Sequence, residues 1–138
     1  MTEVEIANFI ENQLHVQGYR AERLEGNAIG STASGFKFYI QLYETSIQFR
    51  CLISLMPESG KWLEFVNSFN KKMRFVKVYM EDDESLLAEA DWWLDSESIN
   101  QVEQFNQAME FWELSLSELK DNLREQLNIV GNSADDTK

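Results

Sequence analysis

The sequence holds few of the side chains from which catalytic and metal centres are built. His15 is the single histidine and Cys51 the single cysteine in 138 residues. Any catalytic triad or histidine-based metal site would therefore rest on one imidazole. One cysteine cannot form an internal disulfide, so nothing here indicates an oxidising compartment.

Basic residues are also scarce, with 12 Lys and Arg against 24 Asp and Glu, and the net charge is −12. Such a chain would repel a phosphate backbone, so nucleic acid is not an expected ligand. The acidic charge has two interpretations. It provides a solvated surface that keeps the protein soluble, or it forms a face that binds a basic protein partner.

Long apolar runs are absent as well. No stretch approaches the ~20 apolar residues that span a bilayer, and residues 1–5 are acidic where a secretory signal would be basic. These absences predict a soluble, cytoplasmic protein without membrane contact. The length suits one domain, for which we expect residues 1–130, followed by a flexible C-terminal tail at 131–138.

The sequence is rich in aromatic side chains. Nine Phe and four Trp stand in a chain that is 43% hydrophobic, which supplies a bulky core and argues against disorder. Apolar residues recur at helical spacing over Thr2–Val16, where Thr2 and Glu5 fit a capping box and Gly18 follows as a possible C-cap. The same spacing predicts a second helix over 59–73.

A third, longer helix is expected to begin at Ser98, where residues 98–101 fit another capping box. Its apolar stripe contains Val102 and Trp112 and continues to Leu127. Phe111 and Leu114 fall off that stripe.

Strand periodicity occupies the segments between the helices. Residues 36–42 and 47–55 alternate apolar and polar side chains around a short break, and residues 74–81 and 86–94 do so around an acidic turn at 82–84. Short strands are also expected near 21–24 and 28–32, with a turn at Gly26-Asn27. The predicted fold class is α+β, an antiparallel β-sheet built from two hairpins with three helices.

Trp92 and Trp93 are consecutive residues of one predicted strand, so their side chains point to opposite faces of the sheet. Trp92 shares its register with Leu86, Ala88 and Ala90, which predicts a core position. Trp93 falls on the other face. Parity assigns that outer face Tyr39, Tyr43, Leu52, Phe75, Tyr79 and Trp93. We expect these aromatic residues, with Phe111, to form a protein interface. The alternatives are that a helix covers this face or that its aromatic residues simply pair across strands.

Other candidate sites have structural explanations. His15 lies near the end of the first predicted helix, where its charge favours the helix dipole, and Cys51 lies on a core register without a partner. The carboxylates at 81–84 are consecutive, unlike those of a calcium loop. Glycines 26–35 match no nucleotide-binding motif. The sequence therefore predicts no catalytic residue, no metal site and no cofactor.

The middle and C-terminal parts resemble the YbjN-like family. In Trp62–Phe75 an Asn-aromatic-Asn-basic run leads into Arg-Phe, and residues 76–86 are similar to the strand, acidic turn and strand of that family. Glu89–Trp92 matches its acidic–hydrophobic strand, and the final helix fits too. The resemblance covers about 58–123, and this chain departs from the pattern at Ser85 and in the bulk of its two tryptophans. It implies a type III secretion chaperone-like fold and a role in bacterial sensory transduction, with no catalytic residues to transfer.

Two functional hypotheses follow. The first is a non-enzymatic protein-binding module, chaperone-like or regulatory, that is a homodimer and docks a protein segment or a second copy. The second is an acidic inhibitor or immunity-type protein that blocks a basic enzyme through charge complementarity. An enzyme is not expected, because nucleophile, base and metal ligands are all missing as sets.

Overall fold

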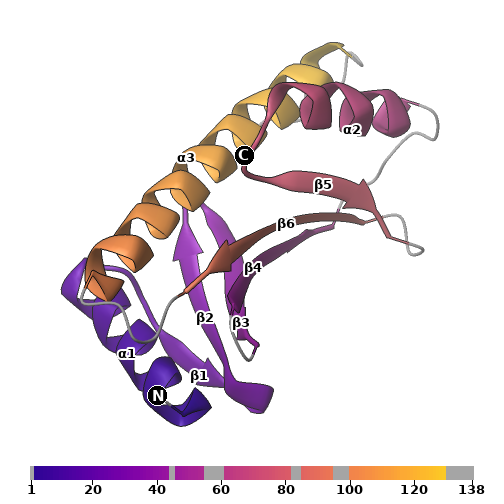
Figure 1. Ribbon diagram of the computed structural model, residues 1–138. Coiled ribbons are helices and arrows are strands. Elements are labelled where there is room, and N and C mark those ends of the chain that lie inside the picture. The colour runs from indigo at the N-terminus through magenta and orange to yellow at the C-terminus, as the bar shows by residue number, and fades with distance from the viewer. Residues whose placement is uncertain (1, 44–45, 55–60, 82–84, 95–99, 130–138) are drawn as a thin grey trace.

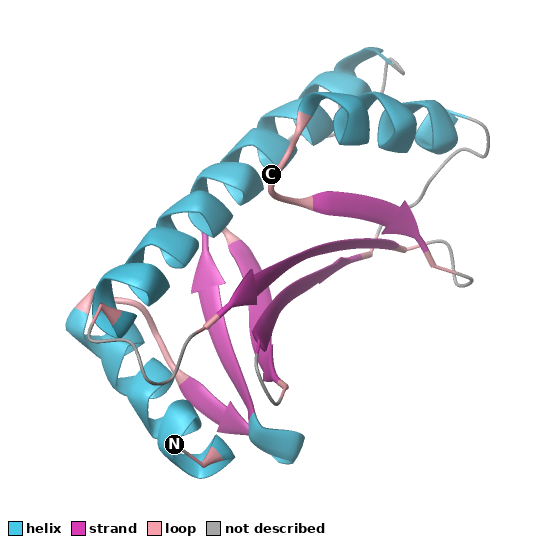
Figure 2. Ribbon diagram, viewed as in Figure 1, coloured by secondary structure: helices cyan, strands magenta, loops and turns pink. Residues whose placement is uncertain are grey.

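The computed structural model describes residues 2–43, 46–54, 61–81, 85–94 and 100–129. Three helices and six strands form an α+β fold, as the sequence predicts (Figures 1 and 2). The helices are α1 (Glu3–Val16), α2 (Lys61–Lys72) and α3 (Gln101–Ile129). The strands are β1 (Glu22–Leu24), β2 (Ala28–Ala33), β3 (Phe36–Leu42), β4 (Ser46–Ile53), β5 (Lys77–Met80) and β6 (Leu86–Trp93), with a short 3-10 turn η1 (Glu25–Asn27).

The first helix has the ends that its sequence predicts. The Thr2 side chain accepts a hydrogen bond from the Glu5 backbone N–H, and the Thr2 N–H donates to Glu5 Oε1 at 2.8 Å. This hydrogen bonding lowers the pKa of the Glu5 carboxyl. At the other end, Gly18 has a φ of 87° and donates to the His15 carbonyl, while the Tyr19 N–H donates to Leu14. That pair of bonds is a Schellman motif, which favours glycine.

All six strands belong to one antiparallel sheet in the order β1-β2-β3-β4-β6-β5. The two predicted hairpins are present as β3-β4 and β5-β6. They join through β4 and β6, which pair over their full lengths from Ser46↔Trp93 to Ile53↔Leu86. Strand β6 of the second hairpin therefore lies inside the sheet beside β4, and β5 forms the edge.

The core lies between one face of the sheet, here called the inner face, and the three helices (Figure 1). Trp112 of α3 is fully buried and stacks on Phe49 of β4 at a ring distance of 5.3 Å, with Phe38 of β3 at 5.7 Å. Phe9 of α1 meets Phe105 of α3 edge to face at 6.1 Å. These contacts tie two helices and the central strands into a single hydrophobic core.

The edge strand β5 is held by α2. The Asn70 side chain donates to the Val78 carbonyl at 2.8 Å and accepts from the Val78 N–H at 2.9 Å. An edge strand otherwise presents unpaired backbone groups to other chains. Asn70, part of the Asn-aromatic-Asn-basic run noted above, thus satisfies the backbone of β5 at this residue.

Some predictions were wrong or fall outside the described residues. The strand expected from Arg74 begins at Lys77, and Val102, expected on the buried stripe of α3, is 44% exposed. The turn at 82–84, Ser98 and the tail at 131–138 lie outside the described residues, as does the side chain of Leu127. Among the helices that the structure describes, none combines the length and apolar character of a membrane span.

Candidate functional site

The candidate site is the sheet face opposite the core, here called the outer face. In the described structure α1, α2 and α3 all pack on the inner side (Figure 1). The alternative in which a helix covers the outer face is therefore wrong for the described elements. Five large apolar side chains of this face are exposed: Trp93 (66%), Leu52 (55%), Tyr43 (48%), Leu24 (39%) and Tyr79 (37%).

Cross-strand register arranges the outer face in rows. One row runs Tyr39–Arg50–Glu89–Lys77 over β3, β4, β6 and β5. The next row runs Leu52–Leu87–Tyr79, and Leu87 is only 3% exposed between its two exposed neighbours. Side chains directly opposite each other in such rows are close enough to pack. The row of Leu87 is thus a small apolar cluster outside the main core.

A polar network holds the middle of the outer face. Arg50 Nε lies 3.5 Å from Glu89 Oε2, and the Tyr79 hydroxyl donates to the same carboxylate oxygen at 3.1 Å. The Arg50 guanidinium carbon lies 5.9 Å from the centroid of the Tyr39 ring. Burial, and then the hydrogen bond to Glu89, raise the pKa of Tyr79. These contacts hold the side chains of Tyr39 and Tyr79 in place on the outer face.

Trp93 and Tyr43 lie at the far corner of this face. Trp93 pairs with Ser46 in register, and the Tyr43 backbone N–H donates to the Ser46 carbonyl. The Tyr43 hydroxyl donates to Gln48 Oε1 at 3.5 Å, and Gln48 Nε2 donates to Asp91 at 2.9 Å. The corner therefore combines exposed rings with hydrogen-bonding groups, which is typical of interface surfaces.

Two of the six predicted interface residues lie elsewhere. Phe75 precedes β5 and does not share its outer register, and its ring packs on Trp92 at 5.4 Å and on Phe111 of α3 at 5.6 Å. Phe111 also lies 6.2 Å from Trp92 and is 42% exposed. Strand β5 starts three residues later than the alternation suggested. Phe75 therefore lies outside the strand, and its assignment to the outer face was wrong. Phe75, Trp92 and Phe111 form an aromatic cluster at the margin of the core.

Two of the rejected sites, Cys51 and His15, lie where their structural explanations place them. Cys51 is 1% exposed and its S–H donates to the Lys37 carbonyl at 3.4 Å, while burial raises the pKa of its thiol to about 12. His15 is exposed near the end of α1. Over the described residues, no group of three or more His, Cys, Asp or Glu is placed to hold a metal ion.

Solved structures with the same fold include two bacterial proteins. YbjN of E. coli, described as "a putative transcription regulator", has a TM-score of 0.62 and 18% identity, over 84% of this chain and 92% of that one. The Yersinia pestis type III secretion chaperone SycH, solved in complex with a stable fragment of YscM2, has a TM-score of 0.51 and 10% identity, over 84% of this chain and 100% of that one. At these identities the likeness establishes the fold alone.

No curated protein matches this chain. A family model does match, over residues 7–125, and it is described as "putative bacterial sensory transduction regulator". This range contains all six strands and nearly all of the described helical residues, including those that carry the resemblance seen in the sequence. The chain therefore belongs to the YbjN family.

Proposed function

We propose that this chain is a non-enzymatic protein-binding domain, chaperone-like or regulatory, that docks a partner on the outer face of its sheet. The observation that carries this proposal is the set of exposed apolar side chains on a face that the described helices leave open, with Trp93 the most exposed at 66%. The burial of apolar surface that is exposed to water contributes about 25 cal/mol of favourable free energy for each Å². A partner that covers this face would recover that free energy.

The composition of the face supports a protein partner. Trp, Tyr and Arg are the residues most enriched at the energetic centres of protein interfaces. Tyr39, Tyr79 and Arg50 are already held by mutual contacts and by Glu89, so little side-chain entropy is lost on binding. The description of the family as regulators and the capture of SycH with a protein fragment point in the same direction.

A matched pair of variants tests this proposal. Trp93→Ser removes the exposed indole of the outer face, and Leu114→Ser removes a side chain of α3 that is 60% exposed. Partner capture from the native cytoplasm should fall with Trp93→Ser and stay unchanged with Leu114→Ser, while both variants keep the wild-type circular dichroism spectrum. Equal capture by all three proteins would refute the role of the outer face.

A second copy of the chain is one candidate occupant of this face, as the predicted homodimer requires. Light scattering after gel filtration, at low and high salt, gives the mass directly. A salt-resistant dimer that Trp93→Ser converts to monomer would place self-association on the outer face. A monomer at both salt concentrations would leave the face to a different protein.

The acidic-inhibitor hypothesis has support from α3. Its exposed residues include Glu103, Glu110, Glu118, Asp121 and Glu125. We propose a basic enzyme as the partner of this helix face, as a second candidate function. Binding should then weaken steeply as salt is raised, because exposed charges are screened within about 8 Å at physiological ionic strength. Salt-independent affinity would exclude it.

A further inference from the structure

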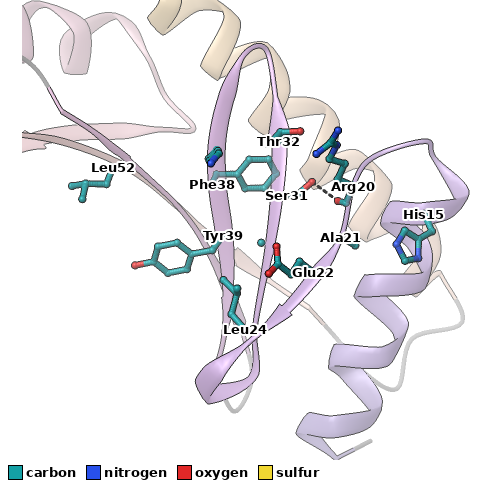
Figure 3. Close-up of a pocket in the computed structure, with 12 residues that line it drawn as sticks. His15, Arg20, Ala21, Glu22, Leu24, Ser31, Thr32, Phe38, Tyr39 and Leu52 are labelled. Atoms are coloured by element: carbon teal, nitrogen blue, oxygen red, sulfur yellow. Dashed lines mark hydrogen bonds between the residues drawn. The ribbon is translucent and has the colours of Figure 1, made fainter.

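The outer face carries an open hollow at the end of the sheet formed by β1, β2 and β3. It has a volume of about 840 Å³, and its lining includes Arg20, Leu24, Gly30, Lys37, Tyr39 and Leu52. Figure 3 shows Tyr39, Leu24 and Leu52 on one side of it and Arg20 and Thr32 on the other. Pockets that bind small molecules commonly have volumes of about 300–1,000 Å³.

Gly30 is one of the residues that line the hollow. Gly30 of β2 stands between Glu22 of β1 and Tyr39 of β3 in register, on the outer face. A Cβ there would lie 3.3 Å from Leu24 Cδ1 and 3.7 Å from Leu24 Cγ. Gly30 has no positive φ, so its backbone does not require glycine. The absence of a side chain at Gly30 instead lets Leu24 pack closely over the backbone of β2, so that Leu24 and Tyr39 form the apolar part of the hollow.

The charge of the hollow is opposite to that of the chain. Its lining includes Arg20, Lys37, Glu22 and His15, so its formal charge is +1, with His counted as neutral, in a protein of net charge −12. Among the described residues, the side chains of Arg20 and Lys37 form no hydrogen bond or ion pair, whereas the outer-face Arg50 is paired with Glu89. Two unpaired cations beside an apolar floor favour an acidic ligand with an apolar anchor.

We propose that this hollow binds a short, extended, acidic peptide segment of a partner protein. An apolar side chain of the peptide packs against Leu24 and Tyr39, and carboxylates two residues before and two residues after it reach Lys37 and Arg20. In an extended peptide these carboxylates lie on the same face as the apolar side chain and about 13 Å apart, while β1, which follows Arg20, and β3 are about 10 Å apart. The long side chains of Arg20 and Lys37 span that difference.

This inference rests on the proposed function and names the class of segment that the outer face accepts. The acidic remainder of the protein would repel an acidic segment, so binding is confined to the hollow. The charge complementarity thus supplies specificity as well as attraction.

A display library of random dodecamer peptides, selected on the full-length wild-type chain, tests the inference. The enriched peptides should contain more Asp and Glu than the input library, together with an aromatic or aliphatic residue. Fluorescence anisotropy of one such labelled peptide should show about tenfold weaker binding for Lys37→Glu. Gly30→Leu should weaken it similarly, because Leu fills the floor of the hollow. Lys71→Glu, which makes the same charge change at an exposed residue of α2, should change the affinity less than about twofold.

Different failures have different meanings. Peptide binding that resists Lys37→Glu and Gly30→Leu but is lost in Trp93→Ser would overturn the hollow as the site and leave the proposed function standing. Enrichment of basic or uncharged peptides would overturn the acidic chemistry. A library without enriched peptides, together with a dimer that Lys37→Glu dissociates, would identify a second copy of the chain as the occupant and overturn the inference.

Discussion

Trp92 and Trp93 are adjacent in β6, and their side chains have different environments on the two faces of the sheet. Trp92 packs against Phe75 and Phe111 at the margin of the core, while Trp93 is 66% exposed beside Ser46. The inner face is covered by helices and filled with rings that contact one another. The outer face keeps its rings at the surface and arranges them around ion pairs and hydrogen bonds. Aromatic residues on the inner face therefore stabilise the fold, while those on the outer face are available for the recognition that we propose.

The same contrast appears in the polar groups. On the helix-covered side, Asn70 satisfies both backbone groups of Val78. On the outer face, Gln48 and Asp91 form an exposed hydrogen bond that water can replace. Water replaces a partly buried hydrogen bond less readily than an exposed one, so the loss of the Asn70 contacts should cost more.

The largest effect should come from the centre of the inner face. Trp112→Ala removes a fully buried ring that touches Phe38 and Phe49, and it should lower the free energy of unfolding by about 3–5 kcal/mol. Leu52→Ala, on the outer face, should change it by less than about 1 kcal/mol. Urea unfolding followed by circular dichroism measures both. Similar decreases in the free energy of unfolding of the two variants would contradict the view that the inner face contributes more to stability than the outer face.

The neighbouring tryptophans give a sharper test. Trp92→Ala should destabilise the protein by about 2 kcal/mol, because the cluster with Phe75 and Phe111 loses its central contacts. Trp93→Ala should stay within about 0.5 kcal/mol of the wild type, since the indole is mostly in water. Chemical denaturation of the two single variants decides the matter. A large loss in Trp93→Ala would show that its ring supports the fold.

Polar substitutions extend the test to hydrogen bonds. Asn70→Ala leaves the Val78 N–H and carbonyl without their partner and should cost about 2 kcal/mol. Gln48→Ala breaks only exposed contacts and should cost less than about 0.5 kcal/mol. Hydrogen exchange at Val78, measured by NMR, should accelerate in the first variant only. Unchanged exchange there would show that water or another group replaces Asn70.

Thiol chemistry distinguishes the faces with the smallest change in structure. Cys51 is buried, and Leu52→Cys in a Cys51→Ala background moves the thiol to the outer face. The new thiol should react with a disulfide reagent at least about a hundredfold faster at pH 8, because it is exposed and ionises more readily. Comparable rates would show that the inner face opens frequently.

The pH dependence of stability follows from the same cysteine. Burial raises the pKa of the Cys51 thiol from its ordinary 9.0 to about 12. Its contribution to stability is complete below pH 9 and is lost as pH rises from 9 toward 12, because the unfolded state then releases the proton first. The difference in unfolding free energy between wild type and Cys51→Ala should shrink over that range. A constant difference would contradict the raised pKa.

Much of the fold was predictable because local pattern and local chemistry agreed. The capping box at Thr2 and Glu5, the C-terminal glycine at residue 18 and the 36–42 strand are as expected. The assignment of Phe75 failed because it depended on where a strand begins, and alternation alone does not fix a boundary. Sequence reasoning also missed the hollow that Gly30 lines. A glycine within a predicted strand does not show which side chains from other strands surround it.

The sequence by itself determined the type of each element and the opposite orientations of Trp92 and Trp93, because both follow from backbone periodicity. It also determined the acidic charge and the presence of a single histidine and a single cysteine. Only the tertiary structure decided that β6 lies between β4 and β5, that the described helices share one side of the sheet, and that Arg20 and Lys37 line the same hollow. These features join residues far apart in the chain, and such packing depends on the whole core.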